Sequence, residues 1–204
     1  MEVSGKTARE TLAHLWVRLR ANASAGESTS DELPLHPELF SSEQMRSHGR
    51  FLAGSHQLDP GRVSDRLLAR LADNERVLMG AFGVLTAAVR ANRRIAPAGE
   101  WLLDNFYLIE EQIRTARRHL PKGYSRELPR LAHGPSAGLP RVYDIALEAI
   151  SHGDGRVDAE SLSSFVAAYQ SVTALKLGEL WAIPIMLRLA LIDNLRHVAS
   201  RGCG

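Results

Sequence analysis

The sequence predicts an all-α fold, an antiparallel multi-helix bundle of about seven helices, and three observations support this prediction. Leu, Ala and Arg dominate a composition in which aromatic residues make up only 6%, and this favours helices over strands. Apolar residues recur at helical spacing in successive segments. Strand-like alternation of useful length is absent from the sequence. At 204 residues with 45% hydrophobic content, the chain can form one domain with a sizeable core.

Residues 1–32 are predicted to form a short N-terminal helix and a flexible linker. The helix is expected over residues 7–21, where the apolar residues follow the i, i+3, i+4, i+7 pattern: Leu12, Leu15, Trp16 and Leu19. Residues 22–31 are small and polar, as is typical of a linker.

Residues 33–199 are predicted to form the helical domain, and residues 200–204 a tail. Its first helix should be capped by Ser41 or Ser42 and run to about Ser55.

The middle of the chain contains two long predicted helices. Asp59-Pro60-Gly61 breaks the chain and opens a helical region that reaches Arg94. The next helix should begin at Pro97, since proline is well tolerated at a helix start, and its apolar stripe is predicted to be Leu102, Leu103, Phe106, Ile109 and Ile113. It ends at a Pro121-Lys122-Gly123-Tyr124 corner.

The last third of the domain is predicted to hold three helices. Pro140 is well placed in the first turn before a helix over residues 142–152. Asp158 should cap a helix over residues 159–170. Thr173 is expected to cap the last helix, which Pro184 must kink or divide before it ends near residue 199.

Composition excludes several classes of protein. A net charge of +2 gives no global field that would favour nucleic acid or an anionic membrane. The single cysteine, Cys203, permits no internal disulfide and no CxxC metal site. The apolar stretch 180–195 is interrupted by Arg188 and Asp193 and is too short to span a bilayer. The chain is therefore expected to be soluble, without a membrane span of its own.

No metal site is expected from the sequence. The segment Gly153-Asp154-Gly155 invites a calcium-loop interpretation, but the ligand positions that follow from it would hold Ile150, His152 and Ser161 instead of carboxylates. The eight histidines include no HExxH or comparable cluster and read as dispersed helix-end or surface residues.

The charged residues after Pro97 have two interpretations. Glu110 and Glu111 could serve acid–base chemistry, but Glu110 and Arg114 also form a favourable i, i+4 ion pair. Residues 114–130 carry six basic side chains against one acidic, with Tyr124 among them. Such a surface could contact phosphate or nucleic acid, or be a solvated or partner-docking face.

Motifs for catalysis and cofactors are absent from the sequence. It has no glycine-rich phosphate loop, no Asp-x-Asp, no GxSxG and no cysteine nucleophile in context. No catalytic residue, no cofactor and no complete enzyme are expected.

Five segments together resemble the N-terminal region of the cyclic β-1,2-glucan synthases. They are 38–45 (ELFSSEQM), 71–78 (LADNERVL), 100–113 (EWLLDNFYLIEEQI), 120–129 (LPKGYSRELP) and 178–189 (GELWAIPIMLRL). The resemblance implies a large bacterial inner-membrane protein whose cytoplasmic transferase region uses UDP-glucose, followed by a phosphorylase-like region. No position here matches the transferase's catalytic residues, so the chain is expected to be a fragment or a truncated copy of such a synthase.

The resemblance leads to a hypothesis: a non-catalytic helical module that organises the transferase or holds the growing glucan, in the cytoplasm and held at the inner membrane through the rest of the synthase. Its partners would be that remainder or a β-glucan chain, and no nucleic acid. The expected functional surface is Trp101, Asn105, Lys122, Tyr124, Arg126 and Glu127. The alternative is an independent helical adaptor that binds a protein partner.

Overall fold

A computed structural model describes residues 40–61, 66–152 and 158–202, and this part of the chain is mostly helical. Its elements, in order, are α2 (Ser42–Ser55), β1 (Leu58–Asp59), α3 (Arg66–Arg90), α4 (Pro97–His119), the short 3₁₀ helix η2 (Tyr124–Glu127), β2 (Arg130–Leu131), α5 (Arg141–His152), α6 (Ala159–Gln170) and α7 (Leu177–Gly202). The described residues thus hold six α-helices, against about seven expected from periodicity. The helix and linker predicted for residues 1–32, and the turn at residues 153–155, lie outside the described residues.

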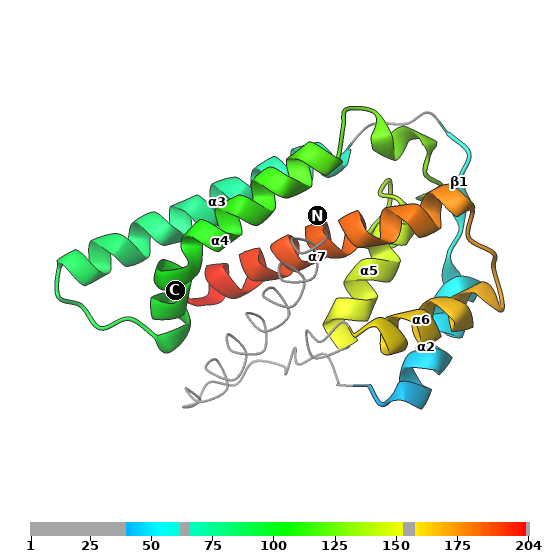
Figure 1. Cartoon of the computed structure of the whole chain (residues 1–204), viewed down its shortest axis with the longest axis horizontal. Helices are drawn as coiled ribbons and strands as arrows, with labels where there is room; N and C mark the ends of the chain where they lie inside the picture. Colours follow the sequence, from blue (N-terminus) through cyan, green and yellow to red (C-terminus); the bar gives the residue numbers. More distant parts are fainter. Residues whose placement is uncertain (1–39, 62–65, 153–157, 203–204) are drawn as a thin grey trace, which may run out of the picture.

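The helices form two groups joined by α5 and α7 (Figure 1). Helices α3 and α4 run side by side and pack against α7, which also contacts α5. Helices α2 and α6 pack together at the other end of the molecule. None of the helices in the described ranges combines the length and the apolar character that crossing a bilayer requires.

The larger hydrophobic core lies between α3, α4, α5 and α7. Leu78 of α3, Ala116 of α4 and Met186 of α7 are each fully buried in it. Between α3 and α4, the rings of Phe82 and Phe106 stack with centroids 4.2 Å apart. The apolar stripe predicted for the Pro97 helix is confirmed: Leu102, Phe106, Ile109 and Ile113 are buried, and Leu103 packs partly buried against the same core.

A smaller core joins α2 and α6 to α5. Phe165 and Tyr169 of α6 are fully buried in it, together with Leu52 of α2. The two helices approach closely at Gly49, where an added Cβ would lie 2.9 Å from the Phe165 carbonyl oxygen. Gly49 therefore lets α2 pack directly on the backbone of α6.

Local capping signals correctly predicted several helix starts. Ser41 caps α2 in a reciprocal capping box: its hydroxyl accepts from the Gln44 amide at 3.3 Å, and the Gln44 side chain accepts from the Ser41 amide at 2.8 Å. Pro97 is in the first turn of α4, and Asp158 caps α6 as expected.

The predicted start of the last helix was wrong. Helix α7 begins at Leu177, and the Thr173 hydroxyl instead donates to the Ala53 carbonyl at 3.4 Å. The Lys176 amide before the helix donates to the Glu179 carboxylate at 2.9 Å. Pro184 lies inside α7 and does not divide it, because the helix continues from Leu177 to Gly202.

The region predicted to be helical from residue 59 to Arg94 is shorter than expected. Its start is occupied by β1, which pairs with β2 in antiparallel register, Leu58 opposite Leu131. Strands of two residues show no alternation that a sequence pattern could reveal. Helix α3 ends at Arg90, and Asn92 then adopts a left-handed conformation with φ of 52°.

A buried ion pair joins α5 to α7. Arg141 donates from Nε and Nη2 to the two carboxylate oxygens of Glu179, at 2.6 and 2.7 Å. The side chains are only 3% and 1% exposed. Arg141 also donates to the Ala174 carbonyl at 2.9 Å. The hydrogen bonds to Glu179 outweigh the opposing effect of burial and raise the pKa of Arg141.

Replacing Asp158 with Ala should lower the free energy of unfolding by about 1 kcal/mol at neutral pH, because the carboxylate accepts the Ser161 amide at 2.7 Å. The Ser161 backbone hydrogen bond lowers the pKa of Asp158 in the folded state. A depressed pKa contributes stability above the unfolded pKa and loses it as pH falls through the folded pKa. Urea unfolding should therefore separate the variant from the wild type at pH 7 and show the difference shrinking as the pH drops below about 4.

The exposed Asp104 on α4 offers a matched control for this cap. Asp104→Ala should change the free energy of unfolding by less than about 0.5 kcal/mol at either pH. An Asp158→Ala effect that persists unchanged in acid would show that the cap is not the cause.

Candidate functional site

A polar cleft of about 500 Å³ opens between α2, α5, α7 and the loop around residue 134. Its volume is in the range of small-molecule binding sites. The polar side chains that line it come from five segments of the chain: Ser55, His56, Gln57, Arg70, His133, Ser136, Asp144, Glu148, Ser151, Asp193, Asn194 and His197.

His56 links two other polar groups in the wall of this cleft. Its Nε2 lies 3.1 Å from Asp144 Oδ2, and its Nδ1 lies 2.9 Å from the Tyr169 hydroxyl. In the neutral imidazole, Nε2 donates to the carboxylate and Nδ1 accepts from Tyr169. Burial raises the pKa of Tyr169, which keeps the hydroxyl protonated as this arrangement requires. Both ring nitrogens of His56 are therefore engaged within the protein.

Arg70 and Asp193 form a second polar group on the opposite wall. Arg70 Nη2 donates to Asp193 Oδ2 at 2.8 Å, and its Nε donates to the Tyr143 hydroxyl at 3.1 Å. Burial, and then the nearby Asp193 charge, raise the pKa of Tyr143, so it stays neutral. Asp193 Oδ1 is buried, and none of the described residues donates a hydrogen bond to it.

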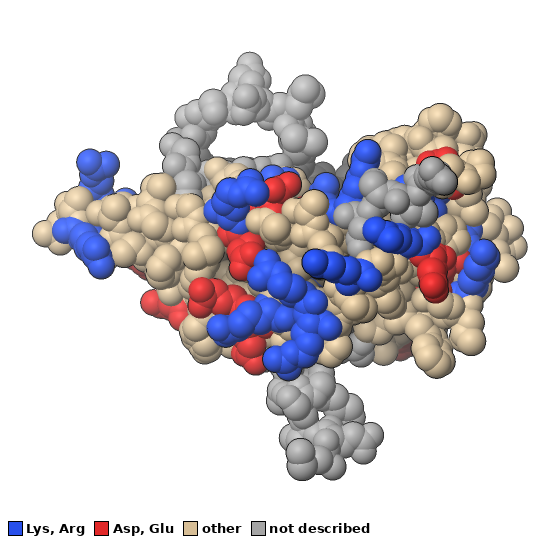
Figure 2. All heavy atoms as spheres, turned by 90° about the horizontal axis from the view of Figure 1, so that it is seen from above, with Lys and Arg blue, Asp and Glu red and all other residues tan. Residues whose placement is uncertain are grey.

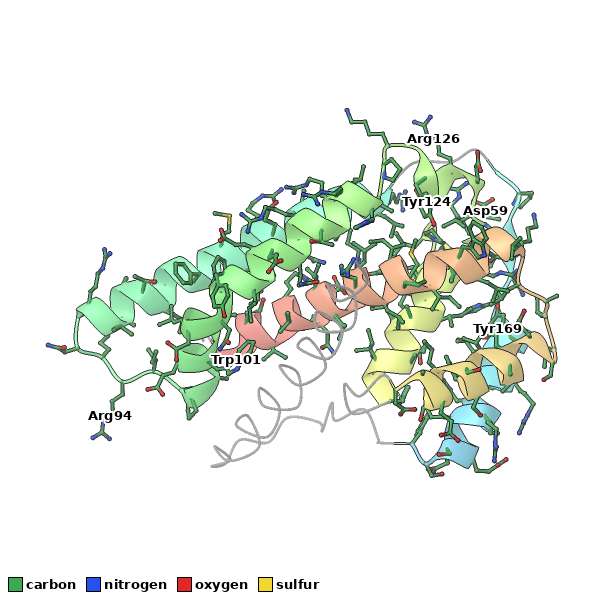
Figure 3. The ribbon with its side chains drawn as sticks, viewed as in Figure 1. Asp59, Arg94, Trp101, Tyr124, Arg126 and Tyr169 are labelled. Carbon is green, nitrogen blue, oxygen red and sulfur yellow. The ribbon has the colours of Figure 1, made fainter. Side chains whose placement is uncertain are left out.

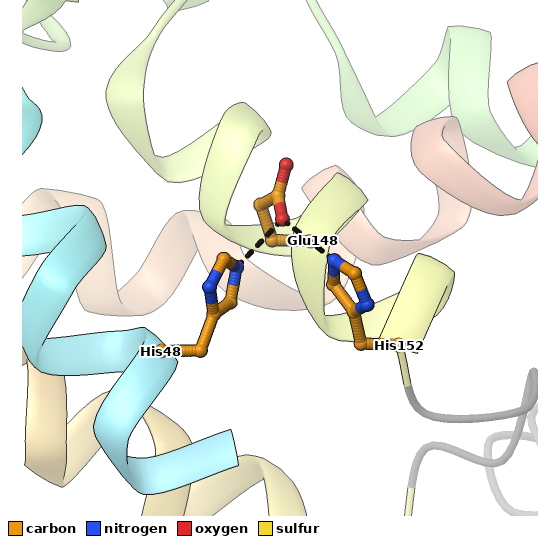
Figure 4. A group of neighbouring side chains, drawn as sticks. All are labelled: His48, Glu148 and His152. Carbon is orange, nitrogen blue, oxygen red and sulfur yellow. Dashed lines mark hydrogen bonds and ion pairs between the residues drawn. The ribbon is translucent and has the colours of Figure 1, made fainter. Parts of the chain in front are cut away.

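A third polar group, formed by His48, Glu148 and His152, lies at the edge of the cleft (Figure 4). No motif in the sequence predicts that these side chains meet. Glu148 Oε2 lies 2.7 Å from His48 Nε2 and 3.3 Å from His152 Nε2. One ligand atom from each residue lies within 4.8 Å of the others, as a shared metal ion would require. The expectation that the histidines are dispersed was therefore wrong for His48 and His152, which the fold brings together.

The six residues that the sequence predicted to form one functional surface lie in two separate places (Figure 3). Trp101 packs partly buried against the larger core near the start of α4, and Asn105 donates to its carbonyl at 2.8 Å. Lys122 follows the end of α4, and a helix rises about 1.5 Å per residue, so the two places are roughly 30 Å apart.

The other four predicted residues do lie together, in and before η2 (Figure 3). Lys122, Arg126 and Glu127 are exposed, whereas Tyr124 packs partly buried against the larger core. Gly123 turns the chain at this corner with φ of 87°, a conformation that favours glycine.

The charges on the surface are mixed in sign. In Figure 2, Lys and Arg side chains gather near the middle of the face shown, with Asp and Glu side chains beside them. Arg114, Arg117 and Arg118 of α4 are exposed, and Arg117 pairs with Glu75 of α3 at 2.5 Å.

Sequence reasoning missed the residues of the cleft. His56 directly follows α2, Asp144 lies in α5 and Tyr169 in α6, and no local motif connects them. One signal was present: Glu148 and His152 are four positions apart, a spacing that places both on one helix face.

Comparison with known proteins gives one informative match. No protein-family profile matches the chain. The cyclic beta-(1,2)-glucan synthase NdvB of Rhizobium meliloti (strain 1021) is 35% identical in an alignment 189 residues long, and this alignment covers 85% of the present chain. The chain is related to this synthase. The relationship to NdvB confirms the resemblance inferred from the five sequence segments.

The match covers most of this chain but only a small part of the synthase. This chain spans 7% of the length of NdvB. The activity, substrate and partners of the whole synthase are therefore proposals where this chain is concerned.

Proposed function

We propose that this chain is a non-catalytic helical module of a cyclic β-1,2-glucan synthase system, which makes β-1,2-glucan from UDP-glucose. The observation that carries the proposal is the similarity to NdvB over 85% of this chain but only 7% of the synthase. In NdvB, the segment that matches this chain is a small part of a much longer protein. It would work in the cytoplasm, held at the inner membrane through the rest of the synthase.

The pairing of polar groups in the cleft supports a non-catalytic role. A general base needs a ring nitrogen or carboxylate oxygen that can reach a substrate proton. His56 already uses both ring nitrogens for Asp144 and Tyr169, and Arg70 is engaged by Asp193 and Tyr143. These contacts stabilise the junction of the end of α2 with α3, α5, α6 and α7.

An exposed apolar face on α7 supports docking to the rest of the synthase. Leu177 and Trp181 are 66% and 76% exposed. With the exposed Pro184 they follow i, i+4, i+7 spacing, so all three lie on one side of the helix. Tryptophan is enriched among the residues that contribute most to protein–protein binding. Two of the three residues, Trp181 and Pro184, lie within the segment 178–189 that resembles the synthases, and Leu177 directly precedes it.

Replacing Trp181 with Ala should weaken binding to the NdvB synthase from which the segment aligned with this chain has been deleted. We expect a loss of about 2 kcal/mol, roughly thirtyfold in Kd, because a central aromatic anchor is removed. The free energy of unfolding should change by less than about 0.5 kcal/mol, since the side chain is 76% exposed. Biolayer interferometry and urea unfolding measure the two quantities.

Tyr107 on α4 is 63% exposed and provides a matched control. Tyr107→Ala should bind the shortened synthase like the wild type. Equal binding by Trp181→Ala and the wild type would remove the α7 face from the proposal.

A second candidate, direct contact with the glucan, is favoured by one observation. Asp193 Oδ1 is buried in the wall of the cleft and accepts no hydrogen bond from the described residues; the Nε of Arg196 lies 3.8 Å away from it. A sugar hydroxyl could donate to it. The residues predicted from sequence at the Lys122 corner, and Trp101 with Asn105 at the other end of α4, remain two further proposed locations for glucan.

Titration with linear β-1,2-glucan distinguishes these possibilities. Amide shifts around Asp193 would place the glucan in the cleft, and shifts around Lys122 would place it at the corner. No change in amide shifts or tryptophan fluorescence at millimolar glucan would leave only the docking role. An independent adaptor, the alternative class, would instead bind a protein other than the synthase in the absence of sugar.

A further inference from the structure

We propose that His48, Glu148 and His152 bind a divalent metal ion of the zinc class between α2 and α5. The three side chains converge from two helices (Figure 4), with one ligand atom of each within 4.8 Å of the others. The inference does not depend on the proposed function, because it rests only on these donor atoms and their surroundings.

The donor set fits zinc better than calcium or magnesium. Two imidazole nitrogens and one carboxylate oxygen form a mixed nitrogen–oxygen set that zinc accepts in tetrahedral sites. Calcium and magnesium prefer oxygen ligands. Three protein donors leave a fourth position for water, and Glu148 lines the polar cleft from which that water can enter.

The two imidazole rings are held in position by aromatic neighbours. The ring of Phe40 stacks on His152 with centroids 4.0 Å apart and an interplanar angle of 2°. On the other side, Phe165 lies nearly parallel to His48 at 6.2 Å. The side chains of His48 and His152 are only 19% and 18% exposed. Such restriction reduces the loss of side-chain freedom when an ion binds.

The contacts of the Glu148 carboxylate must adjust to admit an ion. Zinc–ligand bonds of about 2.0–2.1 Å in a tetrahedron place neighbouring donors about 3.3 Å apart. The His152–Glu148 distance of 3.3 Å already fits, whereas the His48–Glu148 distance of 2.7 Å is that of a hydrogen bond and must lengthen. The Glu148 side chain is 30% exposed, so its carboxylate has room to rotate.

Titration of the whole chain with zinc chloride tests the proposal. Calorimetry should give one saturable site, and cobalt(II) should produce the visible absorption of a tetrahedral complex. His48→Asn and Glu148→Gln should each weaken the affinity by at least about tenfold. His133→Asn is the matched control, because His133 lines the same cleft but is not in the cluster. It should bind zinc like the wild type.

Circular dichroism of each variant separates loss of metal from loss of folding. If His48→Asn does not fold, the nearly isosteric Glu148→Gln carries the test. A saturable site whose affinity falls in Glu148→Gln but not in His133→Asn supports the proposal. No saturable zinc binding by the wild type, or equal affinity in folded Glu148→Gln and the wild type, would overturn it.

Discussion

Replacing Arg141 with Met should lower the free energy of unfolding by about 3–5 kcal/mol, because it leaves the Glu179 carboxylate buried without its partner. Both side chains are almost completely inaccessible to solvent, at 3% and 1%. Glu179 would keep only the Lys176 amide as a described hydrogen-bond donor. Urea unfolding at pH 7 measures the loss as a fall in the midpoint at constant slope.

Two controls make this prediction specific. Arg46→Met breaks an ion pair with Glu43 whose side chains are 47% and 69% exposed, and should leave the midpoint of urea unfolding almost unchanged, because solvent screens an exposed pair. The double variant Arg141→Met, Glu179→Leu removes both buried charges and should recover most of the lost stability. A double variant that is no more stable than Arg141→Met would contradict the explanation from an unpaired charge.

Replacing Phe165 with Ala should lower the free energy of unfolding by about 3–5 kcal/mol, since its fully buried ring fills the smaller core. The loss should be largest where α2 packs on α6, because Phe165 contacts both Gly49 and His48. Hydrogen exchange should therefore show amides of α2 losing more protection than amides of α3 and α4.

Phe51 on α2, the helix that packs on Phe165, provides the control for this cavity. Its ring is 71% exposed, so Phe51→Ala should change the free energy of unfolding by less than about 0.5 kcal/mol. Equal loss of protection in α2, α3 and α4 after Phe165→Ala would show that the two cores unfold as one unit.

Features decided by neighbouring residues could be predicted from the sequence. The start of α2 follows from Ser41 and Gln44, and the start of α6 follows from Asp158, because a helix cap involves residues only three positions apart. The apolar stripe of α4 was predicted correctly for the same reason: helical spacing alone decides which residues share a face.

Features decided by distant residues could not be predicted in this way. The beginning of α7 depends on Glu179, whose carboxylate is held by Arg141, 38 positions earlier. His48 and Glu148 are 100 positions apart in the sequence. The pattern of either helix alone therefore does not predict their contact. The distance between Trp101 and Lys122, in contrast, could have been predicted from the sequence. The length of the predicted helix between the two residues already places them far apart.

The central claim, that this chain is a module serving a glucan synthase, has one direct measurement: β-1,2-glucan formed from UDP-glucose by NdvB lacking the segment aligned with this chain. Adding the purified chain should restore synthesis by the shortened enzyme, and Trp181→Ala should restore it less well. The chain alone should form no glucan. Glucan formation by the chain alone, or no change in synthesis when it is added, would contradict the claim.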